Sequence, residues 1–327
     1  LPAVFGTDVP KGNYADLTTK GFELSVSWRD QFQLASKPFN YEVRFTLADY
    51  QSTIDKYNNP EKKLGDDYYY EGMKVGEIWG YETEGFFTSQ ADIDSHAKQP
   101  YFYAGATAGQ WLPGDIKFKD LNGDGVIDYG NNTVDNPGDQ KIIGNSEPRF
   151  IYGINLSGDW NNFFVSAFFQ GVGKQDWWPG SEASYFWGMY NRPYNDMPKS
   201  HLGNIWTEEN PNTYFPRLRG YSSEEPYAEL NLKQTRYLQN IAYIRMKNIQ
   251  LGYTLPKSFI SKLRMQNAKV YVSGENLWSW SPFYKYSKDL DVEAVRGSDR
   301  DLTEGTSGNG YSYPILKSVS FGLSVTF

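Results

Sequence analysis

The chain has 327 residues, no cysteine and a formal net charge of −7 at neutral pH. The absence of cysteine excludes disulfides, thiolate nucleophiles and cysteine-based zinc sites, and the acidic balance argues against nucleic acid as a partner. Aromatic residues make up 17% of the sequence, the mean hydropathy is −0.64, and no stretch approaches the ~20 consecutive apolar residues of a transmembrane helix. This combination is typical of a transmembrane β-barrel or of a soluble aromatic-rich β-protein.

Alternation of apolar and polar residues predicts β-strands along most of the chain. Successive side chains of a strand point to opposite faces, so each such segment has one apolar and one polar face. Seven segments show the pattern, each about ten residues long, which is the length with which a tilted strand crosses a bilayer. They cover residues 22–29, 41–47, 150–156, 163–169, 243–253, 270–277 and 319–327.

The connections between these segments are of two kinds. Those at about 34–40, 157–162 and 256–267 are short, whereas those at about 54–149, 175–240 and 280–313 are long. Antiparallel strands in chain order place all the long connections at one end and all the short ones at the other. Outer-membrane barrels have short periplasmic turns and long external loops, so the long connections are predicted to be extracellular and the C-terminus periplasmic.

Seven strands cannot close a barrel of the even-numbered bacterial type. Either a long connection contains further strands, for which 77–87 is a candidate, or the remaining strands belong to polypeptide that precedes Leu1. The N-terminus, which carries neither an initiator methionine nor a signal peptide, is typical of a mature or cut product.

The final strand alternates strictly from Val319 and ends on Phe327. A terminal aromatic on an alternating strand, with a glycine five residues earlier, resembles the signal by which bacterial outer-membrane barrels are recognised for assembly. The residues predicted to form that signal are Gly322, Val325 and Phe327.

An aspartate-rich segment has the spacing of an EF-hand calcium loop. Position 12 of the loop, however, is Asn131 rather than a bidentate glutamate, which weakens the site. The alternative is an Asx-rich loop closed by its own hydrogen bonds without a metal. The predicted ligands of a structural Ca²⁺ in an external loop are Asp120, Asn122, Asp124, the carbonyl of Val126, and Asp128.

Aromatic side chains cluster in the second long connection. In an external loop such rings stack on a ligand or anchor a partner interface. Trp278 and Trp280, by contrast, follow a strand and are expected in the aromatic girdle at a membrane interface. The residues predicted to contact a ligand or a lid protein are Trp177, Trp178, Tyr185, Trp187 and Tyr190.

No pattern indicates a catalytic site. His96 and His201 lie in polar, loop-like segments and are expected at the solvated surface. Paired carboxylates are expected to be solvated loop charges, since nothing in the sequence holds two of them at the separation that glycoside hydrolysis requires. These pairs are Glu208 with Glu209, Glu224 with Glu225, and Asp289 with Asp291.

Six segments, in collinear order, resemble the C-terminal half of SusC/RagA-type TonB-dependent transporters of Bacteroidetes outer membranes. One such match would be weak, but the ordered set is specific. The segments are 19–24 (TKGFEL), 80–87 (GYETEGFF), 114–125 (GDIKFKDLNGDG), 143–153 (IGNSEPRFIYG), 243–256 (YIRMKNIQLGYTLP) and 270–277 (VYVSGENL).

This resemblance implies an all-β fold in which the chain supplies the C-terminal strands of a larger, about 22-stranded, plugged barrel. The plug, the TonB-binding segment and the first strands would precede Leu1. The implied function is TonB-dependent import of an oligosaccharide, or alternatively a peptide, across the outer membrane beneath a SusD-like lipoprotein. Expected partners are that lipoprotein, TonB, the N-terminal part of the transporter and membrane lipid. The alternative from another class is a soluble glycan-binding protein or glycanase.

Overall fold

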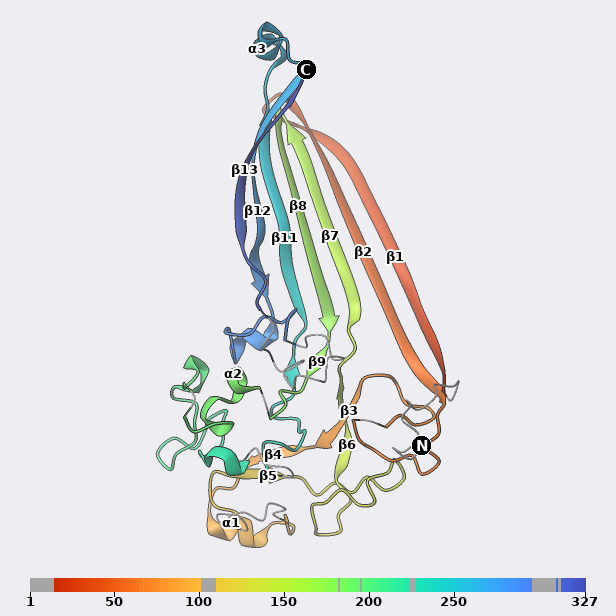
Figure 1. The fold of residues 1–327 in the computed structure, drawn as a ribbon, viewed down its shortest axis with the longest axis vertical. Coiled ribbons are helices and arrows are strands. Elements are labelled where there is room, and N and C mark those ends of the chain that lie inside the picture. Colours follow the sequence, from red (N-terminus) through yellow and green to blue (C-terminus); the bar gives the residue numbers. More distant parts are fainter. Residues whose placement is uncertain are drawn as a thin grey trace, which may run out of the picture.

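The computed structural model describes residues 15–66, 68–100, 110–181, 183–194, 196–223, 228–295, 310 and 313–327. Seven long strands form one antiparallel sheet in which neighbours in the sheet follow the chain order (Figure 1). The number of predicted strands in this sheet is therefore confirmed. The strands are β1 (Asp16–Leu34), β2 (Lys37–Lys56), β7 (Arg149–Trp160), β8 (Phe163–Lys174), β11 (Tyr243–Thr254), β12 (Asn267–Trp280) and β13 (Ser318–Thr326).

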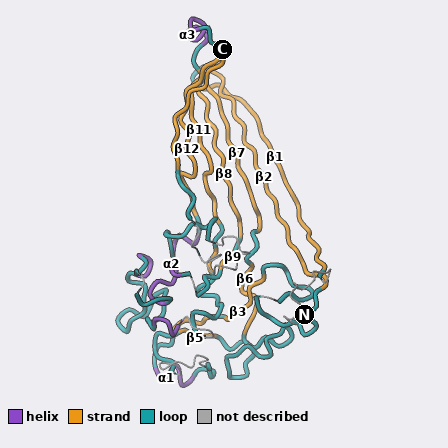
Figure 2. The backbone as a smooth tube through the Cα atoms, in the orientation of Figure 1, coloured by secondary structure: helices purple, strands orange, loops and turns teal. Residues whose placement is uncertain are grey.

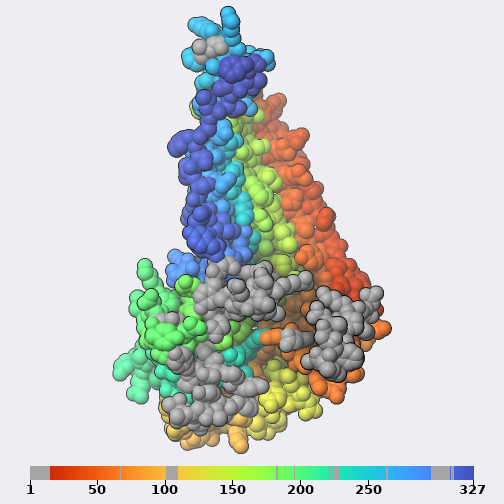
Figure 3. Space-filling model, viewed as in Figure 1, coloured from red at the N-terminus to blue at the C-terminus, as the bar shows by residue number. Residues whose placement is uncertain are grey.

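The short and long connections separate to opposite ends of the sheet, as predicted (Figure 2). The narrow end carries two hairpin turns, the helix α3 (Lys257–Ile260) and the C-terminus. The long connections form a wider assembly at the other end, which gives the molecule its tapered outline (Figure 3).

Two hairpins at the narrow end are tighter than the alternation predicted. Ala35 and Ser36 link β1 to β2, and Asn161 and Asn162 link β7 to β8; all four have positive φ. Two consecutive residues of positive φ form the turn whose twist matches that of the flanking strands. The strands therefore include Leu34 and residues 37–40 and 157–160, where the sequence predicted turns, and β1 and β2 reach 19 and 20 residues.

The register of the sheet aligns the apolar positions of all seven strands on one face. Directly paired residues share a face, so one pairing row can be followed from edge to edge. Because the described residues leave this face uncovered, Trp28 is 61% exposed and Val319 60% exposed. The row consists of Trp28, Val43, Leu156, Ala167, Ile249, Gly274 and Val319.

The opposite face is polar along the neighbouring row. Its side chains can hydrogen-bond with water, so the sheet is amphipathic over its whole width. At the first two positions Arg29 and Glu42 form an ion pair with 2.9 Å between Nε and Oε2. This row consists of Arg29, Glu42, Ser157, Ser166, Gln250, Ser273 and Ser320.

Glycines on the sheet accommodate aromatic rings of the neighbouring strand. Gly322 pairs with Tyr271, and a Cβ atom at position 322 would lie 2.1 Å from the tyrosine ring. Gly252 pairs with Phe164 in the same way, with a corresponding distance of 2.2 Å. The aromatic ring covers the glycine backbone, an arrangement that pins strand register.

Most of the buried core lies among the long connections, and it includes Ile54, Val172 and Tyr243 at the adjoining ends of β2, β8 and β11. The segment 77–87 does form strands, as one interpretation of the sequence allowed, but they pair within the connections and add nothing to the seven-stranded sheet. The short strands are β3 (Glu77–Tyr81) with β6 (Gln140–Asn145), β4 (Thr83–Phe86) with β5 (Ile116–Phe118), and β9 (Asp176–Trp177) with β10 (Gln239–Asn240).

Helices are few and short. Within the described ranges, none of them has the length and apolar character needed to cross a membrane. The remaining α-helices are α1 (Gln90–Ser95) and α2 (Ser184–Trp187), and 3-10 turns cover Gly188–Tyr190, Lys199–His201, Gly220–Ser223, Ser261–Leu263 and Pro282–Lys285.

Candidate functional site

The aromatic cluster predicted to contact a ligand or a lid divides into a buried and an exposed part. Trp187 and Tyr190 are fully buried and Trp177 is 4% exposed. Trp178 packs against this core and Tyr185 is 55% exposed. Burial of large rings stabilises the connection itself, so the assignment of Trp177, Trp187 and Tyr190 to a contact surface is corrected to a core role. The predicted surface role remains available to Tyr185.

The histidines also differ from the expectation of a solvated surface. His201 is 1% exposed, and its Nε2 lies 2.9 Å from the carbonyl oxygen of Phe186. Burial lowers the pKa of this imidazole, which favours the neutral form. The Nε2 of His96 lies 2.8 Å from the carbonyl oxygen of Phe118. Both rings thus hold loop backbone in place.

A cluster of two acidic and two arginine side chains joins the first long connection to the second. Asp115 and Glu229 are both completely buried. Arg217 contacts Asp115 through two nitrogens, at 2.5 and 3.2 Å, and Nη1 of Arg219 lies 3.1 Å from Asp115 and 3.8 Å from Glu229. Burial, together with the nearby Asp115 carboxylate, raises the pKa of Glu229 to about 8. The cluster fixes two distant segments against each other.

A second ion-pair cluster corrects the prediction that Asp291 is a solvated loop charge. Asp291 accepts a hydrogen bond of 2.5 Å from Nη2 of Arg245, a β11 residue that is 3% exposed. Glu293 lies 2.7 Å from Nε of the same arginine and 2.5 Å from Nζ of Lys247. The third long connection is thereby attached to the end of β11. Glu224 and Glu225 lie outside the described residues.

The aspartate-rich segment forms a loop closed by its own backbone. The carboxylate of Asp120 accepts hydrogen bonds from the N–H groups of Gly123 and Gly125 at 2.6 and 2.9 Å, and these bonds lower its pKa. Asp124 accepts from Val126 at 2.8 Å and Asn122 from Asp124 at 2.9 Å. Across the described ranges, no group of three or more histidine, cysteine or acidic side chains is positioned to hold a metal ion.

Asp128 and the residues after it continue this network. Asp128 accepts from the N–H of Gly130 at 2.7 Å and donates its own N–H to Asp139 at 2.9 Å. As arranged, the loop matches the Asx-rich alternative drawn from the sequence. A cation would have to compete with these hydrogen bonds for the side-chain oxygens, so calcium binding remains a prediction.

The predicted assembly residues lie together on the edge strand β13 or directly after it. Gly322 lies against Tyr271, Val325 pairs with Ala268, and Phe327 is 76% exposed. Contact with Tyr271 therefore explains the glycine at position 322. Packing among the described residues does not explain the exposed ring of Phe327. Trp278 and Trp280, at 46% and 57% exposure, lie at the end of β12 nearest the long connections.

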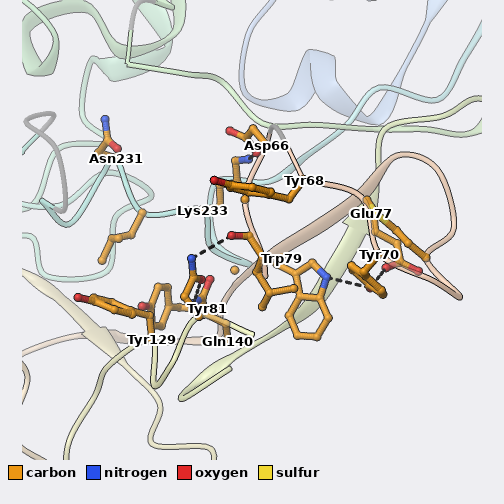
Figure 4. A pocket seen from close by; sticks show the side chains of 16 residues that line it. Asp66, Tyr68, Tyr70, Glu77, Trp79, Tyr81, Tyr129, Gln140, Asn231 and Lys233 are labelled. Carbon is orange, nitrogen blue, oxygen red and sulfur yellow. Dashed lines mark hydrogen bonds and ion pairs between the residues drawn. The ribbon is translucent and has the colours of Figure 1, made fainter. Parts of the chain in front are cut away.

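Sequence reasoning missed a pocket among the long connections, shown in Figure 4. Its volume is about 440 Å³, within the range of roughly 300–1,000 Å³ typical of small-molecule sites. The residues come from five separate segments, so no local pattern could have revealed it. Those that matter below are Asp66, Tyr68, Tyr70, Glu77, Trp79, Tyr81, Tyr129, Asn132, Gln140 and Lys233.

One wall of this pocket depends on a close backbone approach. The N–H of Tyr81 donates to the carbonyl of Lys233 at 2.8 Å, and the N–H of Thr235 donates to the carbonyl of Tyr81 at 3.0 Å. A Cβ atom at Gly80 would lie 2.3 Å from the same Lys233 carbonyl. Only glycine at position 80 allows β3 to lie this close to the segment that carries Lys233.

Comparisons with known proteins agree with the fold and the motifs. The chain is 26% identical over 345 residues to the TonB-dependent receptor P3 of Formosa agariphila, and 26% identical over 344 residues to the TonB-dependent receptor P26 of the same organism. Each alignment covers 100% of this chain but only 30% and 31% of the relative, so the chain spans about a third of the length of these curated relatives. No family model matches.

Among solved structures, the RagAB peptide transporter is similar with a TM-score of 0.66 and 17% identity, over 100% of this chain and 31% of that one. The RagAB peptide importer in its open-open state is similar with a TM-score of 0.60 and 18% identity, over 100% and 30% of the two chains. The structural likeness shows a shared fold. Together with the relatives, it confirms the resemblance to SusC/RagA-type TonB-dependent transporters. The relatives are receptors and transporters, which agrees with the prediction that the chain is not an enzyme.

Proposed function

We propose that the chain is part of a TonB-dependent transporter that imports a nutrient across the bacterial outer membrane. The observation that carries the proposal is the apolar face of the seven-stranded sheet, continuous from Trp28 to Val319. Monomeric soluble proteins rarely expose contiguous apolar patches of more than a few hundred Å². Contact with lipid removes that face from water, while the polar face lines the lumen.

The barrel would be closed by strands from the N-terminal part of the same transporter. Both β1 and β13 have an unpaired edge in the described structure, and unpaired backbone groups are not tolerated within the hydrocarbon region. About 22 strands around a plug is the architecture that such transporters use. In this arrangement the C-terminus is periplasmic and the long connections are extracellular.

The extracellular connections would hold the substrate together with a SusD-like lipoprotein. The substrate is proposed to be an oligosaccharide, with a peptide as the alternative because the similar solved structures are described as peptide transporters. Tyr185 provides an exposed ring on that side for the lipoprotein. Energy coupling through TonB would use the N-terminal region of the transporter.

The proposal is tested by membrane fractionation and uptake. The full-length protein is expected in the outer-membrane fraction, released by detergent and not by buffer alone. Growth on the imported nutrient should be lost when either the transporter gene or TonB is deleted. A protein that is recovered in buffer without detergent would instead support the soluble glycan-binding alternative.

Removal of Phe327 tests the assembly signal within the same experiment. The exposed terminal ring is expected to be needed for insertion, so deletion should lower the amount of heat-modifiable barrel in the outer membrane. Thr326→Ala, a change to the adjacent exposed residue, is the matched control and should assemble normally. Equal assembly of the deletion variant and the control would contradict the predicted signal.

A further inference from the structure

We propose that the pocket between Tyr68, Tyr129 and Lys233 binds one or two sugar rings of a neutral oligosaccharide. This inference rests on the proposed function, because it treats the long connections as the extracellular side of a transporter. It adds a specific subsite, on β3, β6 and three neighbouring loop segments, to the general expectation that these connections hold the substrate.

Two aromatic rings are open to solvent at this pocket. Tyr68 is 48% exposed and Tyr129 42% exposed, and both line the cavity (Figure 4). One face of a pyranose ring presents C–H groups, which pack on an aromatic face, while its edge presents hydroxyls. Tyrosine suits this contact because it combines a large apolar ring with a polar tip.

The rings behind them are held in fixed positions. Trp79 Nε1 donates to the hydroxyl of Tyr70 at 3.3 Å, and that hydroxyl donates to Glu77. Glu77 also accepts from the N–H of Lys74 at 3.0 Å. Tyr81 is 4% exposed and packs on Phe118 with 5.3 Å between ring centroids. A wall that is ordered before binding reduces the entropy cost of holding a ligand.

The polar groups of the pocket suit an uncharged ligand that carries many hydroxyls. Lys233 and Asp66 form an ion pair, and the Glu77 carboxylate already accepts hydrogen bonds from the Tyr70 hydroxyl and the Lys74 N–H. Nε2 of Gln140 makes two long hydrogen bonds, 3.4 Å to Asn132 and 3.5 Å to the carbonyl of Pro137. Bonds of this length are weak, so a ligand hydroxyl can compete for the amide. Sugar hydroxyls can both donate and accept hydrogen bonds, so they can pair with the donors and the acceptors that line this pocket.

A peptide side chain fits the same lining less well. An apolar side chain would cover the Gln140 amide and the Asp66–Lys233 pair without replacing their hydrogen bonds to water, and a polar group that is buried without a partner is unfavourable. A cationic side chain would compete with Lys233 for Asp66, and an anionic one would lie near the Glu77 carboxylate. The volume of about 440 Å³ further limits the occupant to a small group or a short end of a longer chain.

The test compares tyrosine variants of the full-length transporter, purified in detergent, on an array of neutral oligosaccharides and on a library of unmodified peptides. Tyr68→Ala and Tyr129→Ala remove the exposed rings, and Tyr68→Phe keeps the ring without the hydroxyl. Tyr313→Ala is the matched control, because Tyr313 is 78% exposed and does not line this pocket. Heat modifiability on gels verifies that each variant is folded.

The expected result is retention of at least one neutral oligosaccharide by the unmodified protein, by Tyr313→Ala and by Tyr68→Phe. Tyr68→Ala and Tyr129→Ala should bind it at least tenfold more weakly. The proposal is overturned by equal glycan binding in all folded variants, by no neutral glycan binding at all, or by peptide binding that only the two pocket variants lose. Binding in detergent does not involve TonB. A negative binding result would therefore overturn the sugar-binding pocket without overturning the proposed transport function, which is tested separately by TonB-dependent uptake.

Discussion

Arg217 and Asp115 form a two-point ion pair, at 2.5 and 3.2 Å, that joins segments 102 residues apart in the chain. Asp115 is completely buried, whereas the Arg217 side chain retains 24% exposure. Removing one member of a buried pair leaves the other charge without a partner and typically costs about 3–5 kcal/mol. The two longest connections are therefore expected to lose their mutual packing when this pair is broken.

Asp115→Asn tests that expectation directly. The amide cannot neutralise two guanidinium groups, so we expect an opening of the loop assembly and faster proteolysis near residues 110–118 and 213–223 of the full-length protein. Heat modifiability of the barrel should change little. Glu61→Gln, which breaks the exposed Lys63–Glu61 pair, is the control and should leave the proteolysis rate unaltered. Equal rates for both variants would argue against a structural role of the cluster.

The pKa of Glu229 predicts how the loops respond to pH. Burial and the Asp115 carboxylate raise this pKa to about 8 in the folded loops, against about 4.3 for an unperturbed glutamate. A raised pKa means that the folded state holds the proton more tightly. The stabilisation is thus full below about pH 4 and is lost as the pH rises toward about 8.

Glu229→Gln should flatten this pH dependence, because the glutamine stays uncharged throughout. The measurement is the midpoint temperature at which the loops unfold, followed by tryptophan fluorescence. It is repeated from about pH 5 to about pH 9, a range that includes the Glu229 pKa of about 8. The unmodified protein should lose stability across this range more steeply than the variant. Parallel curves would show that Glu229 does not titrate here.

Gly322→Ala tests the packing of the Tyr271 ring against the terminal strand. A methyl group would lie 2.1 Å from the tyrosine ring, and such overpacking typically costs about 1–3 kcal/mol. We expect a lower temperature of heat modification and less assembled protein. The double variant with Tyr271→Ala should recover part of the loss, since the clash is then removed. Ser324→Ala on the same face is the control, and a similar loss in that variant would contradict the packing explanation.

Calcium binding by the 120–128 loop is tested by titration calorimetry on the full-length protein. A loop with the EF-hand spacing but no glutamate at position 12 is expected in the weak class, with a Kd on the order of 10⁻⁴–10⁻³ M. Asp120→Asn and Asp124→Asn should abolish the heat of binding. Asp94→Asn, on the exposed surface of α1, should leave it intact. If the unmodified protein gives no heat, the loop is closed by its hydrogen bonds alone.

The sheet could be predicted almost completely from the sequence, because its pattern is local. Alternation of apolar and polar residues predicts all seven strands, and the lengths of the connections predict which end of the sheet carries the short turns and which carries the long segments. The prediction failed at the hairpins, where Ala35 and Ser36 adopt positive φ without the usual Asn-Gly or Asp-Gly signal. Strand pairing overrides weak turn preferences there, since each continued residue gains ladder hydrogen bonds.

The connections were less predictable, because their contacts are between distant residues. A run of aromatic residues reads the same whether the rings face solvent or pack together. Trp187 and Tyr190 were therefore assigned to a contact surface although they are fully buried. The same reasoning placed His201 in solvent, whereas it bonds to the carbonyl of Phe186 within the core.

The amino-acid sequence alone is enough to predict which face of each strand is apolar, how many strands lie in the sheet and at which end the long connections gather. These properties follow from side-chain alternation and chain length. The folded structure was needed to establish which rings are buried, which charged side chains pair and where a pocket forms. The approach of Lys233 to Gly80 and of Arg217 to Asp115 depends on the packing of segments more than 100 residues apart, and no local pattern specifies such a meeting.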